Sequence, residues 1–349
     1  MQQIRDNASR ILIIYTGGTV GMVYDKRLQT LRPFEFTELQ DRIPEMYKLG
    51  YHYFVHSFKT PIDSSDMNPD IWIKIVEIIA QNYNHYDGFV ILHGTDTMAY
   101  TASALSYLLE NLSKPVILTG SQLPIGEIRT DARENIITAL EIAAKKGADG
   151  LPLVPEVGIF FDFKLFRGNR AKKYNVEKFK AFHSMNYPAL AEAGVTIKYQ
   201  EEACLPQPHK PLVVHKALDK NIAALRLFPG ISQNIIEGII HSKEIKGIIL
   251  ESFGAGNTPT APWFLQTIKK AINNGKIVLN NSQCGGGSVS LGQYETSKYL
   301  KEIGVISGFD MTFEAAVTKL MFVLGLNKSY EETKSLLQKP LRGEFTLPS

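Results

Sequence analysis

The sequence is poor in cysteine and nearly balanced in charge. Its 349 residues include two cysteines, Cys204 and Cys284, so few that a disulfide scaffold and a four-cysteine zinc site are both excluded. Lys and Arg number 38 against 35 Asp and Glu, which leaves a formal net charge of +3. So small an excess gives no reason to expect nucleic acid or an acidic membrane as a partner.

Long hydrophobic runs are also missing. Spanning a bilayer takes about 18 or more consecutive apolar residues, and no stretch of this sequence approaches that length. The apolar run at 11–15 is shorter than the core of a secretory signal, and a glycine turn follows it directly. We therefore expect no membrane association and a cytoplasmic location.

Short apolar runs instead alternate with longer segments of helical period. Hydrophobic residues make up 44% and charged residues 21% of the chain, as in globular proteins. Runs that are apolar on both faces are typical of parallel strands covered by helices on both sides. This pattern predicts an α/β protein with mostly parallel sheets. The predicted strands are 11–15, 88–92, 116–119, 157–162, 247–250 and 276–280, and the predicted helices are 69–83, 97–112, 130–145 and 261–273.

The length predicts two domains. Three prolines fall within six residues at 206–211, and proline favours extended backbone and stops helices. We predict a larger N-terminal domain over 1–197 that carries the catalytic residues, a linker over 198–217, and a smaller C-terminal α/β domain over 218–349. The alternative is a long surface loop inside one domain.

Polar side chains and glycines follow three predicted strands at the point where each one ends. The segments are 16–19 (TGGT), 93–97 (HGTDT) and 119–122 (TGSQ). Ligands bind outside the carboxyl ends of parallel strands, so we expect these segments to meet at one crevice. Two of them also have a simpler interpretation, since the first is typical of a tight turn and Asp96 in the second is a candidate helix cap.

Several kinds of site are not supported. Gly17, Gly18 and Gly21 lack the spacing of a dinucleotide fingerprint, and no Gly-Lys-Ser/Thr of a phosphate loop occurs. His52 and His56 lack the glutamate of a zinc-protease helix and fit a strand face better.

The remaining chemistry is that of a threonine nucleophile, because no Gly-x-Ser-x-Gly elbow occurs and Cys284 fits a small buried thiol. A threonine hydroxyl needs a neighbouring base. Asp96 and a lysine of the segment 160–174, a strand that leads into a basic loop, are the candidates, and burial would favour the neutral amine of such a lysine. The simpler interpretation of that segment is a solvated charged loop.

Five segments in order resemble the bacterial-type L-asparaginases, and in particular their cytoplasmic type I branch. They are 16–19 (TGGT), 63–67 (DSSDM), 93–97 (HGTDT), 167–173 (RGNRAKK) and 308–312 (GFDMT), and the resemblance spans nearly the whole chain. It implies hydrolysis of L-asparagine to L-aspartate and ammonia with no metal or organic cofactor. It also implies a homotetramer that is a dimer of dimers.

The resemblance assigns roles to individual residues. Thr19 corresponds to the primary nucleophile. Thr95, Asp96 and Lys173 correspond to the family's second catalytic set, in which the lysine keeps the threonine basic and the carboxylate orients the lysine and binds the substrate α-amino group. The segment of Asp63, Ser64 and Ser65 corresponds to the one that holds the α-carboxylate and α-amino groups of the substrate.

The chain departs from the family pattern in two places. Relatives carry a tyrosine about ten residues after the nucleophile, on a mobile lid, but here that position falls in 28–30 and the nearest tyrosine is Tyr24. Several relatives use an arginine after the strand at 248–250 to bind asparagine as an effector, whereas this chain has Glu251. The group that replaces the lid tyrosine and the response to asparagine as an effector are therefore left open. Glutamine exclusion is also left open, because glutamine is only one methylene longer and a pocket discriminates that by about 1–3 kcal/mol.

Two alternative functions remain at this stage. One is an amino-acid-binding sensor that does not turn its ligand over. The other is a glutaminase-type subunit that supplies ammonia to a tRNA-dependent amidotransferase. That subunit carries an additional N-terminal domain, whereas fifteen residues precede Thr16 in this sequence, so we expect the asparaginase.

Overall fold

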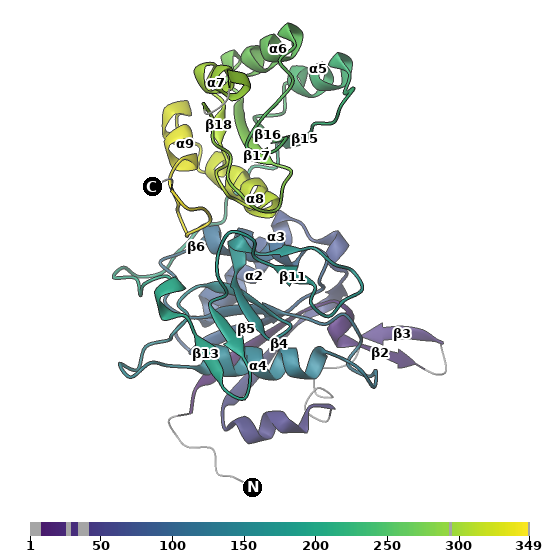
Figure 1. Ribbon diagram of the computed structural model, residues 1–349. Helices are drawn as coiled ribbons and strands as arrows, with labels where there is room; N and C mark the ends of the chain where they lie inside the picture. Colours follow the sequence, from purple (N-terminus) through teal and green to yellow (C-terminus); the bar gives the residue numbers. More distant parts are fainter. Residues whose placement is uncertain (1–7, 26–28, 34–41, 293–294, 348–349) are drawn as a thin grey trace. The chain divides into compact units, whose positions relative to one another are not determined.

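The computed structural model describes residues 8–25, 29–33, 42–292 and 295–347 (Figure 1). Two compact units make up the chain, residues 1–215 and 216–349. Both are α/β folds built on a mostly or wholly parallel sheet, as the sequence predicts. The bounds of the predicted linker, 198–217, remain a prediction.

The N-terminal unit is built on an eight-stranded sheet in the order β13-β12-β9-β8-β7-β5-β1-β4. The five strands β8, β7, β5, β1 and β4 run parallel. The other three, β9, β12 and β13, each run antiparallel to the neighbouring strand. The strands are β1 (Arg10–Gly17), β4 (His52–Ile62), β5 (Gly88–Leu92), β7 (Val116–Thr119), β8 (Val157–Phe161), β9 (Lys164–Arg167), β12 (Ala191–Ala193) and β13 (Ile197–Tyr199).

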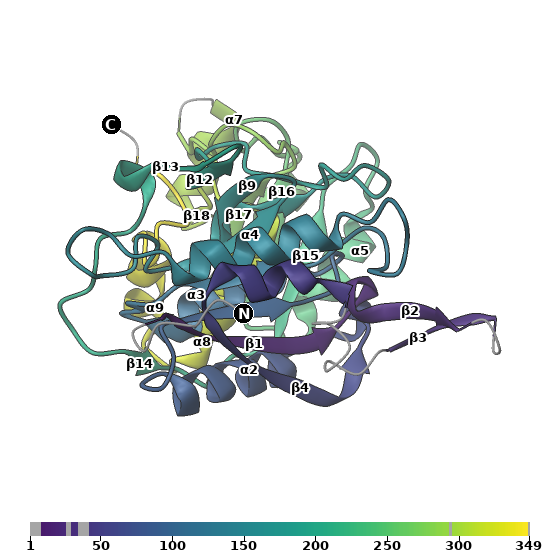
Figure 2. The same cartoon turned by 90° about the horizontal axis from the view of Figure 1, so that it is seen from below.

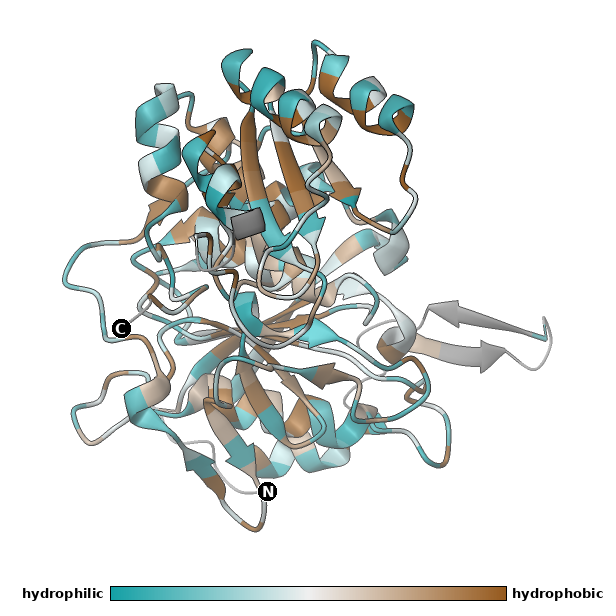
Figure 3. Ribbon diagram, turned by 45° about the horizontal axis from the view of Figure 1, so that its top comes forward, coloured by the Kyte–Doolittle hydropathy of each residue, from teal (hydrophilic) through white to brown (hydrophobic). Residues whose placement is uncertain are grey.

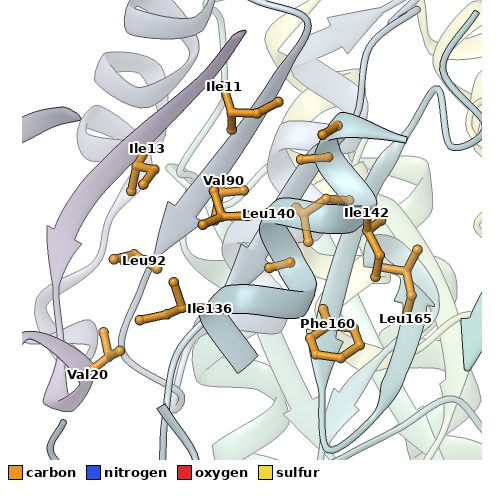
Figure 4. Close-up of a cluster of buried hydrophobic side chains, with 14 of the residues drawn as sticks. Ile11, Ile13, Val20, Val90, Leu92, Ile136, Leu140, Ile142, Phe160 and Leu165 are labelled. Carbon is orange, nitrogen blue, oxygen red and sulfur yellow. The ribbon is translucent and has the colours of Figure 1, made fainter. Parts of the chain in front are cut away.

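Helices cover both faces of this sheet (Figure 2). Helix α4 (Ala132–Ala144) contacts β1, β5, β7 and β8 on one face, while α3 (Met98–Leu108) packs against β7 and β8 and also contacts α2 (Pro69–Asn82). Ile13, Val90 and Leu92 point from the strands toward Ile136 and Leu140 of α4 (Figure 4). Because both faces are covered, the strands are apolar throughout, which is the pattern visible in the sequence.

Shorter elements complete the N-terminal unit. They are the strand pairs β2 (Met22–Asp25) with β3 (Thr30–Pro33), β6 (Leu109–Glu110) with β14 (Val213–Val214), and β10 (Lys172–Lys173) with β11 (Phe182–His183), and the 3-10 turns η1 (Thr19–Gly21), η2 (Pro44–Leu49), η3 (Ser64–Asp66), η4 (Gly168–Arg170) and η5 (Glu201–Ala203).

One predicted helix is too long. The segment 97–112 was expected to be helical throughout, but α3 ends at Leu108 and the chain continues as β6. Asn111 then takes a φ of 59°, which a helix does not allow. The partner of β6 is β14, from the proline-rich region more than a hundred residues later, so this pairing overrides the apolar period of the segment.

The C-terminal unit has a four-stranded parallel sheet in the order β15-β16-β17-β18. Its strands are apolar, whereas its helices carry polar outer faces (Figure 3). The elements are β15 (Ile222–Arg226), β16 (Gly247–Ser252), β17 (Ile277–Ser282), β18 (Ile306–Ser307), α5 (Gln233–His241), α6 (Pro262–Asn273), α7 (Glu295–Glu302), α8 (Phe313–Gly325) and α9 (Tyr330–Leu337). No helix in the described part of either unit is long and apolar enough to cross a membrane.

A fully buried ion pair holds the C-terminal segment against α8. The Nζ atom of Lys319 lies 2.6 Å from Oε1 of Glu344, and neither side chain is exposed. Lys319 also donates to the carbonyl oxygens of Leu337 and Lys339, and Glu344 accepts from two backbone N–H groups at 341 and 342. Each charge is thus fully hydrogen-bonded, which is the condition under which a buried pair is tolerated.

Breaking this pair is expected to destabilise the protein strongly. Glu344→Leu leaves the Lys319 ammonium buried without a counter-charge and should lower the free energy of unfolding by about 3–5 kcal/mol. The double variant Lys319→Met/Glu344→Leu removes both charges and should recover most of that loss. Urea denaturation measures both, and a Glu344→Leu variant as stable as the wild type would contradict the assignment.

Candidate active site

The turn after β1 is held by close contact between backbones. Gly17 and Gly18 have φ values of 135° and 86°, which favour glycine. A Cβ atom on Gly17 would overlap the backbone of Ile62 at the end of β4, and one on Gly18 would overlap the backbone of Gly94 after β5. The carboxyl ends of three neighbouring strands therefore meet here, and Thr19 follows Gly18 directly.

The segment after β4 packs onto the same place. Ser64 is buried, and a Cβ atom on Gly94 would come within 2.6 Å of its Oγ. Its carbonyl oxygen accepts a hydrogen bond of 2.6 Å from Oγ1 of Thr97. Asp63 accepts from the backbone N–H and the hydroxyl of Ser65 at 2.9 and 2.8 Å, and these bonds lower the pKa of the Asp63 carboxyl. It is therefore an exposed anion at the edge of the turn.

A buried histidine, His93, holds the turn after β5 through hydrogen bonds. His93 Nδ1 lies 2.6 Å from the carbonyl oxygen of Gly94, and Nε2 lies 2.9 Å from Oγ1 of Thr101. A carbonyl oxygen only accepts, so Nδ1 carries the proton and Nε2 accepts from Thr101. Thr101 in turn accepts from the indole N–H of Trp72 at 3.0 Å. Burial lowers the pKa of His93 to about 4, so the imidazole is neutral near pH 7.

Three of the predicted site residues, Thr95, Asp96 and Lys173, come together at this turn. The Nζ atom of Lys173, on β10, lies 2.7 Å from Oγ1 of Thr95 and 2.7 Å from Oδ1 of Asp96. The lysine side chain is only 13% exposed, whereas that of Asp96 is 66% exposed. An amine held by a hydroxyl and a carboxylate is the arrangement in which a threonine can be activated.

Gln122, after β7, completes the set, although sequence analysis assigned it no role. Its Oε1 atom accepts a hydrogen bond of 3.3 Å from the hydroxyl of Thr95. The signal was present in the sequence, because an amide follows a strand end that we had singled out. Its contact with Thr95 depends on the order of strands in the sheet, which the sequence does not state.

Comparisons with known proteins identify the family of the chain. The family model for the asparaginase N-terminal domain matches residues 10–205, and that for the glutaminase/asparaginase C-terminal domain matches residues 221–337. The chain belongs to the asparaginase family. It is 41% identical to L-asparaginase 1 of Escherichia coli K12 over 337 residues, which cover 96% of this chain and 98% of that protein.

Two further members of the family are similar over nearly all of this chain. The crystal structure of L-asparaginase I from Vibrio cholerae matches with a TM-score of 0.88 and 41% identity, covering 97% of this chain and all of that one. The 60 kDa lysophospholipase of Mus musculus is 40% identical over 363 residues, which cover 97% of this chain but 63% of that protein.

Of three simpler interpretations, two are wrong and one is confirmed in this asparaginase-family fold. Asp96 does not cap α3, whose N-cap is Thr97 with no side-chain hydrogen bond, because the carboxylate contacts Lys173 instead. The prediction of a buried Cys284 thiol was wrong, since Cys284 is exposed in the loop after β17. His52 and His56 do lie on one strand, β4.

The two departures from the family pattern have different outcomes. Residue 28 and the side chains of Tyr24 and Thr30 lie outside the described part of the chain, so the lid remains a prediction. Glu251 is buried at the end of β16, where Arg226 of the neighbouring strand donates to it at 3.3 Å.

Among the described residues, no group of three or more His, Cys, Asp or Glu could hold a metal ion.

The neutral state of His93 predicts a pH dependence of stability. A histidine whose folded pKa lies near 4 and whose unfolded pKa is about 6.5 stabilises the fold above pH 6.5. That contribution is lost as the pH falls from about 6.5 to about 4, because the unfolded chain binds the proton more readily. Between about pH 7.5 and pH 5 the loss amounts to about 2 kcal/mol.

Urea denaturation at these two pH values tests this. His93→Gln removes the titrating group, so the difference in unfolding free energy between the two pH values should shrink by about 2 kcal/mol relative to wild type. His241→Gln changes an exposed histidine at the end of α5 and should keep the wild-type difference. An unchanged difference in His93→Gln would contradict the neutral buried imidazole.

Proposed function

We propose that the protein hydrolyses L-asparagine to L-aspartate and ammonia with Thr19 as the nucleophile. The observation that carries the proposal is the contact of Lys173 with both Thr95 and Asp96 at 2.7 Å, beside the glycine turn that bears Thr19. The family relationship supports the same reaction. Lysine, hydroxyl and carboxylate around one small-residue turn suit acyl transfer from a linear amide.

The reaction follows from these groups in two steps. The Thr19 oxygen attacks the carboxamide carbon of the substrate, the C–N bond breaks, and the nitrogen leaves as ammonia after it gains a proton. Water then attacks the resulting ester, and the hydroxyl of Thr19 is restored. Thr95, in contact with the amine of Lys173, is placed to move the protons, and hydrogen-bond donors near the turn stabilise the negative charge that develops on the carbonyl oxygen.

Substrate binding uses the exposed carboxylates and the segment after β4. Asp96 is largely exposed, so it can accept from the α-ammonium group of an amino acid while Lys173 holds it in place. The hydroxyls of Ser64 and Ser65 can donate to the α-carboxylate of the substrate, and the Asp63 carboxylate is a second acceptor for its α-ammonium group. A zwitterionic amino acid needs both kinds of group at once.

The wider setting of the enzyme belongs to the same proposal. We infer a homotetramer and a cytoplasmic location, both from the resemblance of the sequence motifs to type I asparaginases. No metal or organic cofactor is needed by the chemistry above, since the lysine and the two threonines supply the nucleophile and the proton transfers. Light scattering coupled to gel filtration tests the assembly state, and a monomer would contradict it.

Ammonia release from L-asparagine tests the proposed residues. Thr19→Ala should lower kcat by at least about 10³-fold, because no other hydroxyl replaces the nucleophile. Lys173→Met should lower it about 10²–10⁴-fold, as expected for loss of a proton-transfer group. Lys173→Arg should not restore activity, since arginine does not act as a base.

Lys172→Met is the matched control for these variants. Lys172 is the neighbouring residue of β10 and pairs with His183, while Lys173 pairs with Phe182, so the two side chains point to opposite faces. Its activity should stay close to wild type. Near-normal turnover in Thr19→Ala or Lys173→Met would contradict the assigned roles, and wild-type protein that binds asparagine without releasing ammonia would indicate a sensor.

The site should distinguish asparagine from glutamine only in part. The two substrates differ by one methylene, which a pocket typically discriminates by about 1–3 kcal/mol, or roughly 10–200-fold in kcat/KM. We expect a preference for asparagine within that range. Parallel kinetic series with both substrates measure it, and a value of kcat/KM for glutamine equal to or above that for asparagine would contradict the expectation.

A further inference from the structure

The orientation of the Gln122 amide is fixed by its own hydrogen bonds. Nε2 donates to the carbonyl oxygens of Val176 and Lys178, both at 3.1 Å. Carbonyl oxygens only accept, so the nitrogen must face these two groups and the oxygen must face Thr95. Since Oε1 also only accepts, the Thr95 hydroxyl donates its proton to Gln122.

This donation decides the direction of the contact between Thr95 and Lys173. A hydroxyl has one proton and two lone pairs, and the proton of Thr95 is already directed to Gln122. Lys173 therefore donates to Thr95 across the 2.7 Å contact. Thr95 can pass its proton to the lysine only after the proton turns away from Gln122. At 3.3 Å the hydrogen bond to Gln122 is longer than the 2.7 Å contact with Lys173, so it is the weaker of the two.

The backbone of Gln122 is also held firmly. Its N–H lies 3.0 Å from both carboxylate oxygens of Asp131, at the start of α4. Asn135, one turn further along α4, donates to Asp131 at 3.2 Å and to the carbonyl oxygen of Gly120 at 3.0 Å. The Gln122 side chain thus projects from a well-ordered base rather than from a free loop.

We propose that Gln122 is a positioning residue, which sets the direction of the Thr95 hydroxyl and ties Thr95 to the loop after Lys173. The loop itself is exposed, with Val176 78% exposed. Within it Asn175 accepts from the backbone N–H groups of Glu177 and Lys178. Gln122 is the side chain that connects this loop to the hydroxyl of Thr95. The role rests on the proposed function, because it concerns how Thr95 exchanges protons with Lys173.

The kinetic test compares two substitutions of Gln122. Gln122→Met has a similar length but no polar atoms, and should lower kcat about ten- to a hundredfold with KM changed less than about threefold, because the misdirected hydroxyl affects the chemical steps. Gln122→Glu adds a carboxylate next to Thr95, which favours the charged form of the Lys173 amine. The acidic limb of its kcat/KM profile should therefore move to higher pH.

A control and a second readout separate this role from a merely structural one. Gln207→Met removes a glutamine that also ties down backbone, through a 2.9 Å bond to the carbonyl oxygen of Pro152, but does not touch Thr95. It should keep the wild-type kcat and pH profile. Trypsin cleavage after Lys178 and Lys180 should be faster in Gln122→Met than in wild type, and this measurement needs no turnover.

The outcomes distinguish the two proposals. Wild-type protein that releases no ammonia contradicts the proposed function, whereas the trypsin experiment still tests the tie between Gln122 and the loop. Active wild-type protein with an equally active Gln122→Met variant contradicts the role of Gln122 alone. A Gln122→Glu variant whose kcat is lower at all pH values, but whose kcat/KM profile has an unshifted acidic limb, also contradicts it. Loss of structure would lower the activity in this way without moving the pH profile.

Discussion

The contact between the turns after β1 and β5 is the constraint on which the site depends. Gly18 lies so close to the backbone of Gly94 that no Cβ atom fits. This closeness brings Thr19 and Thr95, the residues that follow the two glycines, to neighbouring loops at one edge of the sheet. A side chain at position 17 or 18 would have to push these loops apart, and the positive φ values there add a conformational cost.

Two neutral side chains, His93 and Gln122, hold in place the turn and the hydroxyl next to the charged pair Lys173 and Asp96. His93 is buried, uncharged and hydrogen-bonded at both ring nitrogens, so it fixes the Gly94 carbonyl without placing a second cation near Lys173. Gln122 contributes a neutral acceptor and two donors on the other side of Thr95. The ammonium group of Lys173 bonds the neutral hydroxyl of Thr95 and the carboxylate of Asp96, so the charges of Lys173 and Asp96 act on each other and on a substrate.

Two buried carboxylates of the C-terminal unit are paired with basic side chains. Glu251 is paired with Arg226 from the neighbouring strand β15 at 3.3 Å. Lys319 and Glu344 form a fully buried pair whose remaining hydrogen bonds go to the backbone of the C-terminal segment. This pair fastens the end of the chain, since the unpaired charge of either partner would be costly to bury.

Much of the fold was determined by local sequence. The apolar runs at 88–92 and 116–119 became β5 and β7 with the predicted ends, and α2, α4 and α6 begin and end within two residues of prediction. These elements are apolar on the side or sides that the core covers, so the spacing of apolar residues within each segment is enough to predict it. The helix predicted over 97–112 failed at its end because a distant strand, β14, pairs with residues 109–110.

The sequence by itself determined the residue types at each strand end: hydroxyls, glycines, a carboxylate and a nearby basic segment. Only the tertiary structure decided which of them touch. The contact of Lys173 with Thr95 and that of Gln122 with Thr95 join positions 78 and 27 residues apart. The second exists because β5 and β7 are neighbours in one parallel sheet, and the first because β10 packs near α3, the helix that follows Thr95. Strand order depends on how all the helices and strands pack together, and no single segment carries that information.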